Sequence, residues 1–176
     1  HRHNPIAPHV GQQNIKELFF DRLDSRYVVA TAGQKAGGRG RSNTLFHGSE
    51  CAFWANAKDH FSASVQTVPL SPGTEVVLES TANGPGGEFY ERWQDAEAGR
   101  GDYIAIFVPW FESPEYARDP GPAFELSGEA EEGAMSEAEI AEHYGLTNGQ
   151  MAWRRSKMVE QRSMTRFYRE YPSAAH

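Results

Sequence analysis

The sequence predicts an α/β fold with a mostly parallel sheet and flanking helices, and two observations lead to it. Short β-branched segments alternate with helical ones from Thr44 to Pro109, and successive β-α-β units imply parallel strands joined by right-handed crossovers. Two of the strand segments, Thr44–His47 and Glu75–Glu79, each lead into a polar loop. Because parallel strands end at the same edge of a sheet, we expect the two loops to form one site.

Composition agrees with one globular domain. The chain has 176 residues, of which 39% are hydrophobic and 12% aromatic, enough to build a core. Its net charge of −7 argues against a protein that is basic throughout, but leaves room for a local basic face. The single cysteine, Cys51, excludes an internal disulfide, and its apolar neighbours predict a buried structural thiol.

Strand segments are predicted where β-branched residues lie between turn-forming residues. They cover residues 27–32, 44–47, 75–79 and 103–109. The last of these belongs to the longest apolar run, which is far too short to cross a bilayer. The first nine residues lack the apolar core of a signal peptide, so an intracellular protein without membrane contact is expected.

Helices are predicted from apolar residues at helical spacing and from terminal signals. They cover residues 12–26, 54–67, 86–98, 136–145 and 147–162. In the first, Ile15, Leu18, Phe19 and Leu23 would form one face. The last two open with capping boxes at Ser136–Glu139 and Thr147–Gln150.

Acidic and basic residues are unevenly distributed in the second part of the chain. Residues 112–142 contain ten acidic residues and one basic residue, and are rich in proline and glycine up to Gly133. Residues 151–171 contain six basic and two acidic residues. We therefore divide the chain into residues 1–110, with the alternating strands and helices, and residues 111–176, an acidic excursion followed by helices.

Glu50 is the first candidate site residue, because an acid delivered by a strand can polarise an attacking water. Alternatively, it caps the next helix or pairs with an arginine. Ser80, Thr81 and Asn83 follow the second strand and could sense a phosphate or position water. Ordinary turn and N-cap chemistry explains the same three residue types.

Basic residues provide further candidates. Arg39 and Arg41 lie in a glycine-rich loop that could contact phosphates of a nucleotide or of DNA, or could simply be solvated. Arg154 and Arg155 lie in the basic helix, which could face DNA or the acidic segment of its own chain. The sequence contains no G-x-x-x-x-G-K-[ST] phosphate loop, no metal-type cysteine or histidine spacing and no G-x-S-x-G elbow.

Five segments then occur in one order, and together they resemble a known family. They are GRGRSNTLFHGSECAFW, PGTEVVLESTANGPGGEFYERW, FVPWFESPEY, LTNGQMAWRR and FYREYP. In this order they resemble the large subunit of tailed-bacteriophage terminases, the motor that packages DNA into proheads. The resemblance runs from about Tyr27 to Pro172.

The resemblance implies part of a RecA-like P-loop NTPase core in residues 1–110. It also implies a helical linker region in residues 111–176, with FYREYP leading toward a nuclease domain that is absent here and present in the complete protein. Thr44–Glu50 would be the Walker B strand, Glu50 the catalytic glutamate and Ser80–Asn83 the coupling motif. Implied cofactors are Mg²⁺ and ATP. Implied partners are double-stranded DNA, the terminase small subunit, the portal and other copies in a ring. The implied location is the host bacterial cytoplasm.

Two departures from the family pattern matter. Ser49 stands where a Walker B motif usually has aspartate, so it would hold Mg²⁺ only weakly, through water. The Walker A strand, loop and helix, expected upstream, are missing from these residues, as is the nuclease. We therefore expect this chain alone to be inactive as an ATPase and to bind neither cofactor tightly. We also expect it to expose an apolar sheet edge, which favours self-association or a rearranged edge. Arg39 or Arg41 would supply charge to a phosphate in the same or a neighbouring subunit.

Two other functions remain open. The chain could be a non-catalytic, prophage-derived module that binds DNA or another terminase subunit through its basic helix. It could also belong to a different P-loop translocase such as a helicase, although ESTANG and WRR…EYP would then be coincidental.

Overall fold

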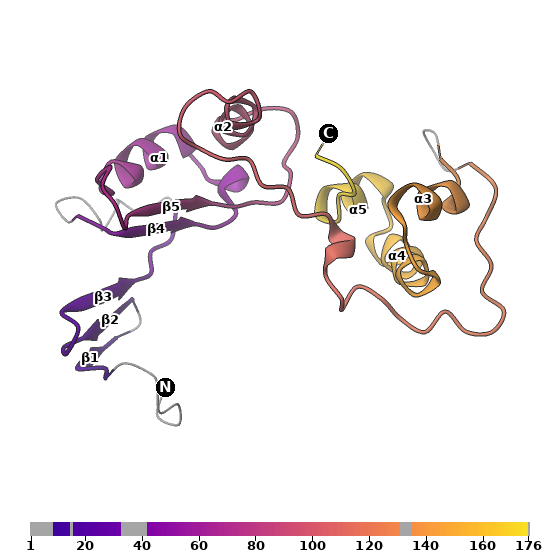
Figure 1. The fold of residues 1–176 in the computed structure, drawn as a ribbon, viewed down its shortest axis with the longest axis horizontal. Coiled ribbons are helices and arrows are strands. Elements are labelled where there is room, and N and C mark those ends of the chain that lie inside the picture. Colours follow the sequence, from indigo (N-terminus) through magenta and orange to yellow (C-terminus); the bar gives the residue numbers. More distant parts are fainter. Residues whose placement is uncertain (1–8, 15, 33–41, 131–134, 176) are drawn as a thin grey trace. The chain divides into compact units, whose positions relative to one another are not determined.

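The computed structural model describes residues 9–14, 16–32, 42–130 and 135–175 and divides the chain into two compact units. The first comprises residues 1–80 with 87–89, and the second residues 81–86 with 90–176. The fold is mixed α/β, as predicted (Figure 1). Within the described residues its parallel sheet has two strands, too few to define a RecA-like core. That core stays a prediction, as does the functional division at residue 110.

The first unit begins with an antiparallel three-stranded sheet in the order β1-β2-β3 (Figure 1). Its strands are β1 Gln12–Gln13, β2 Glu17–Phe20 and β3 Ser25–Val28. The helix predicted over residues 12–26 is therefore wrong. The strand predicted over residues 27–32 overlaps β3 only at Tyr27 and Val28.

Contacts between neighbouring strands explain this error. Phe19 lies opposite Arg26, and the Arg26 guanidinium lies 4.8 Å from the centre of the Phe19 ring. Arg26 also forms an ion pair with Glu17 on the same sheet. Asp24 takes the left-handed conformation, with φ of 43°, in the turn between β2 and β3. Leu18, Phe19 and Leu23 thus have helical spacing but lie around a turn.

The parallel sheet pairs β4 Leu45–Gly48 with β5 Glu75–Leu78, which confirms both strands and their direction. Phe46 lies opposite Val76, and Gly48 opposite Leu78. The 3₁₀ helix η1 Cys51–Phe53 and helix α1 Ala57–Val65 follow β4. α1 lies within the predicted helix 54–67.

Gly48 permits close packing at the end of β4. A Cβ atom placed there would lie 2.8 Å from Cys51 Sγ and 2.9 Å from the Trp54 ring, both too close for a real contact. The Trp54 ring in turn stacks on Phe61, with 5.1 Å between ring centres. Cys51 and Phe61 have no exposed surface, so they form the small core beside the strand ends.

The second unit is mainly helical. It contains most of α2 Glu88–Glu97, the 3₁₀ helix η2 Trp110–Glu112, α3 Glu137–Tyr144, α4 Asn148–Gln161 and α5 Met164–Glu170. Helices α2, α3 and α4 were predicted, whereas α5 was not. The strand predicted over residues 103–109 is wrong as a sheet element, because the segment pairs with no strand among the described residues.

Both predicted capping boxes are present. The Ser136 side chain accepts a hydrogen bond from Glu139 N, and the Glu139 carboxylate accepts one from Ser136 N. Thr147 and Gln150 make the equivalent pair at α4. Gly145 ends α3 with φ of 66°, a conformation that glycine adopts without strain.

Aromatic rings fill the core of the second unit. Trp153 of α4 stacks on Trp110 at 5.1 Å between ring centres and on Tyr116 at 4.5 Å. Phe167 of α5 is completely buried in the same cluster. Trp110 N also donates to the carbonyl of Pro172 (3.2 Å), which ties the end of the described chain to this core. None of the helices in the described residues has the length and apolarity needed to cross a membrane.

Candidate functional site

The loops after β4 and β5 lie together, as the parallel strands require. Cys51 N donates a hydrogen bond to the Glu79 carbonyl (3.1 Å), and Ala52 N donates to Ser80 Oγ (3.1 Å). Glu79 N donates to the Gly48 carbonyl (2.9 Å). Three bonds therefore join the turn that carries Glu50 to the end of β5. Ser80 acts here as a hydrogen-bond acceptor that holds the neighbouring turn.

Glu50 is exposed and takes a strained backbone conformation. Its φ of 54° and ψ of 41° lie in the left-handed region, which costs a residue with a Cβ atom about 1–2 kcal/mol. It occupies the N-cap position of η1, but its side chain makes no capping hydrogen bond. The structure therefore contradicts the alternative that the Glu50 side chain caps the next helix. Strained residues of this kind cluster at functional sites.

His47 and Glu79 form a second polar pair at the same strand ends, which the sequence interpretation missed. His47 Nε2 lies 3.7 Å from Glu79 Oε1, and about half of each side chain is exposed. His47 lies opposite Val77, and Glu79 is two residues beyond Val77, so both side chains lie on one face. The parallel register could have revealed the pair, had the relative alignment of the two strands been known.

Cys51 lies beside this site but is chemically inert. Burial raises the pKa of its thiol from 9.0 to about 12, and the neighbouring carboxylates of Glu79 and Glu50 add to the effect. The nucleophilic thiolate is therefore scarce near neutral pH. The predicted buried structural thiol is confirmed.

The donors near Glu50 do not make a metal site. Ser49 is exposed, and its carbonyl accepts a hydrogen bond from Trp54 Nε1 (2.9 Å). Across residues 9–14, 16–32, 42–130 and 135–175, no group of three or more His, Cys, Asp or Glu side chains could hold a metal ion. The Ser49 hydroxyl and the Glu50 carboxylate alone do not supply the oxygen-rich shell that Mg²⁺ requires.

Of the four other loop candidates, the structure describes Thr81 and Asn83 but not Arg39 and Arg41. Thr81, which is half-buried, and Asn83, which is exposed, belong to the second compact unit. They follow Ser80 in the chain, and their proposed sensing role stays a prediction. Arg39 and Arg41 lie outside the described residues.

Arg154 and Arg155 of the basic helix are both engaged within the chain. Arg154 is only 1% exposed; its Nη2 donates to the Tyr168 hydroxyl (3.3 Å), and its guanidinium lies 5.5 Å from the centre of the Phe167 ring. Arg155 pairs with Glu137, which is the internal pairing that the sequence left open. Each arginine would have to break these internal contacts before it could bind a DNA phosphate.

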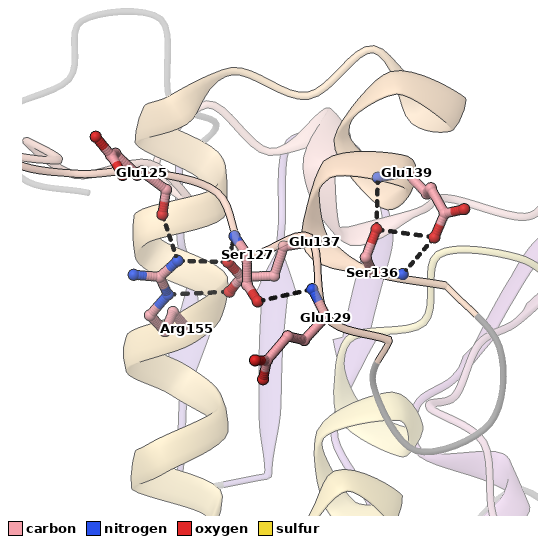
Figure 2. A network of polar contacts seen from close by, with 7 residues as sticks. All are labelled: Glu125, Ser127, Glu129, Ser136, Glu137, Glu139 and Arg155. Atoms are coloured by element: carbon pink, nitrogen blue, oxygen red, sulfur yellow. Dashed lines mark hydrogen bonds and ion pairs between the residues drawn. The ribbon is translucent and has the colours of Figure 1, made fainter.

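Arg155 is the centre of a network that joins α4, α3 and the acidic segment (Figure 2). Its Nε donates to Glu137 Oε1 (2.9 Å), and its Nη2 donates both to Glu137 Oε2 and to the Glu125 carbonyl (2.9 Å). Its guanidinium also lies 4.5 Å from the centre of the Phe124 ring. The arginine therefore binds a backbone carbonyl, a carboxylate and an aromatic ring at once.

The Glu137 carboxylate is almost buried, with its residue 5% exposed. It also accepts a hydrogen bond from Ser127 N (3.0 Å). Burial raises the pKa of Glu137, but the bonds from Arg155 and from Ser127 N outweigh burial and hold it below its ordinary value of 4.5. Glu137 is therefore ionised near neutral pH and fixes the acidic segment against α4.

Comparison with known proteins gives no assignment. No model of a protein family matches the chain, and no curated protein matches it either. The fold and the site define a mixed α/β protein with paired polar loops at the ends of two parallel strands.

Proposed function

We propose that this chain is part of the ATPase domain of a tailed-phage terminase large subunit, the ATP-driven motor that moves viral DNA into proheads. The main supporting observation is the hydrogen bond from Ala52 N to Ser80 Oγ, which joins the turn that carries Glu50 to the loop after β5. In the motif order, these two loops correspond to the Walker B and coupling elements. Their hydrogen-bonded contact would let a change at one loop reach the other.

Glu50 would act as the general base of this site. Its carboxylate ends a strand, is open to solvent and is held in a strained turn. Such a group can orient a water molecule and accept its proton, which typically accelerates hydrolysis by about 10²–10⁴-fold. Ser80, together with Thr81 and Asn83, would transmit the state of the site toward the rest of the motor.

Mg²⁺ and ATP do not fit the residues present here. The sequence contains no phosphate loop, and Ser49 replaces the expected metal-binding acid. A complete site would need these groups from residues outside this chain. DNA, the small subunit, the portal and a ring of copies would be partners of the complete motor in the host cytoplasm.

A pair of matched variants tests the role of Glu50. We would extend the chain by the upstream residues that the resemblance implies, and measure DNA-stimulated ATP hydrolysis. Glu50→Gln should lower turnover by about 10²–10⁴-fold while leaving nucleotide binding intact. Glu75→Gln is the control, because Glu75 is an exposed acid at the opposite end of the same sheet. Retained turnover in Glu50→Gln would contradict the proposal.

The 176-residue chain alone provides a second test. Calorimetry with Mg-ATP should detect no binding, because the chain lacks a phosphate loop. Binding with micromolar affinity would contradict the assignment of this chain as part of a site. It would also direct attention to the glycine-rich residues 37–41 and 83–87.

A further inference from the structure

Residues 103–109 form an apolar segment, outside any helix or strand, in which exposed and half-buried side chains alternate. Ile104, Ile106 and Val108 are 84%, 74% and 68% exposed. Tyr103, Ala105 and Phe107 alternate with them and are half-buried. This alternation has the period of two that an extended strand imposes. Figure 1 draws the segment between α2 and η2 as a tube, with no arrow.

The half-buried face of the segment lies beside α2, where Arg92 Cζ is 5.9 Å from the centre of the Tyr103 ring. Tyr103, Ala105 and Phe107 line an open hollow of about 470 Å³ together with Trp93 and Ala96 of α2, and Ile104 also reaches its edge. All of these residues belong to the second unit. Within the second unit, α2 therefore lies beside one face of the segment, and Ile104, Ile106 and Val108 are exposed.

The backbone of the segment also has no partner within the second unit. Among the described residues of that unit, no backbone hydrogen bond joins Ile104–Val108 to any other residue. Extended backbone with free N–H and C=O groups is a template for pairing with another strand. Main-chain bonds would give such pairing its affinity, and the alternating side chains would set its register.

The composition of the segment favours pairing with the same segment of a second copy of the chain. From Tyr103 to Phe111 it contains no charged residue, although the chain has a net charge of −7. Two copies can therefore pair along this segment without placing like-charged side chains opposite each other. The β-branched residues Ile104, Ile106 and Val108 are also those that favour cross-strand packing.

We propose that two copies of this chain associate through antiparallel pairing of residues 104–108, centred on Ile106. In this register Ile106 lies opposite its own copy, and Ile104 lies opposite Val108. Ala105 then lies opposite Phe107, so a small side chain meets a large one. Opposed residues share a face, and all six exposed side chains come together. The interface is self-complementary and closes at two copies.

The interface is small. A stable protein interface buries about 1,200–2,000 Å² in total, and a strand pair of this length buries less. We expect a concentration-dependent dimer with a dissociation constant on the order of micromolar or weaker. This inference does not depend on the proposed ATPase role, and its tests use no nucleotide or DNA.

Sedimentation of the full chain over about 1 µM to 1 mM tests whether it dimerises. The chain should shift from monomer to dimer, and Ile106→Lys should abolish the shift because it places two like charges opposite each other. Leu70→Lys is the matched control, since Leu70 is 95% exposed and outside the segment. A chain that stays monomeric throughout, or Ile106→Lys that dimerises like Leu70→Lys, would overturn the proposal.

Single cysteines test the register. Opposed Cα atoms in an antiparallel pair are about 4.5–5.5 Å apart, within disulfide reach. Ile106→Cys should therefore cross-link to its own copy under mild oxidation. Ile104→Cys should not, because the two equivalent residues would be about 13 Å apart along the strands. Mixing Ile104→Cys with Val108→Cys should restore the cross-link.

The native cysteine does not interfere, because Cys51 is completely buried. Cross-linking of Ile104→Cys to itself, with none for Ile106→Cys, would overturn the antiparallel register. Circular dichroism of each variant should match that of the unmodified chain, since the substituted side chains are exposed.

Discussion

Arg155 of α4 and Glu137 of α3 form an ion pair in which the carboxylate is almost buried and the guanidinium is partly exposed. The same guanidinium donates to the Glu125 carbonyl, and the same carboxylate accepts from Ser127 N. The pair thus connects two helices with a segment that has no helix or strand of its own. Its removal should loosen that segment.

Glu137→Gln should lower the free energy of unfolding by about 1–3 kcal/mol, because it weakens charge-assisted bonds to Arg155 and to Ser127 N. Glu142→Gln is the control, as Glu142 is an exposed acid on the same helix and should change stability little. Chemical denaturation at about pH 7 measures both. Equal stability of the two variants would show that the pair contributes nothing.

The same pair should make stability depend on pH. The folded pKa of Glu137 lies below its ordinary value of 4.5. Its contribution is therefore present above that pH and is lost as the pH falls through the folded pKa. The unmodified chain should lose more stability than Glu137→Gln when denaturation is repeated near pH 3. A parallel loss in both proteins would contradict this account.

Glu50→Gly should stabilise the chain by up to about 1 kcal/mol, because glycine adopts the left-handed conformation without strain. Asn56→Gly is a close control. Asn56 has φ of 53° and ψ of 41°, almost the same as Glu50, but asparagine tolerates this region better, so its gain should be smaller. Thermal unfolding measures both, and a loss of stability in Glu50→Gly would count against strain at this position.

Gly48→Ala should destabilise the first unit by about 1–3 kcal/mol. The added Cβ would lie 2.8 Å from Cys51 Sγ and 2.9 Å from the Trp54 ring, so one of them would have to move. Gly86→Ala is the control, because nothing lies within 4 Å of a Cβ there. Equal unfolding midpoints for the two variants would argue against close packing at Gly48.

Cys51 should resist alkylation in the folded chain. Burial raises the pKa of its thiol to about 12, so iodoacetamide near pH 8 should label it slowly until denaturant is added. Stability should also fall as the pH rises above 9.0, the ordinary pKa, because only the unfolded chain then readily loses this proton. Mass spectrometry follows the labelling, and rapid modification without denaturant would contradict the predicted burial.

Elements with local signals could be predicted from the sequence. The capping boxes at Ser136 and Thr147 satisfy helix ends with residues three positions away, and both helices are present. The parallel pairing of β4 and β5 was predicted from alternating strands and helices. The meeting of the Glu50 turn with Ser80 follows from that pairing.

Elements that depend on partners far away in the sequence could not be predicted. The contact of Arg26 with Phe19 crosses a turn, and apolar spacing alone could not distinguish it from one face of a helix. The 103–109 segment has the composition of a strand, but composition does not supply a neighbour. The pairing of Arg155 with Glu137 was one of two outcomes that the charge pattern allowed equally.

The stacked indoles of Trp110 and Trp153 have a spectroscopic consequence. Their ring centres are 5.1 Å apart and their planes differ by 19°, so their electronic transitions couple. The coupled pair should give circular dichroism bands of opposite sign that vanish when either residue is replaced by phenylalanine. Trp110 Nε1 also donates a hydrogen bond to Ser173 Oγ (3.0 Å), so a shift of this indole on release of the last described residues would change these bands without any added label.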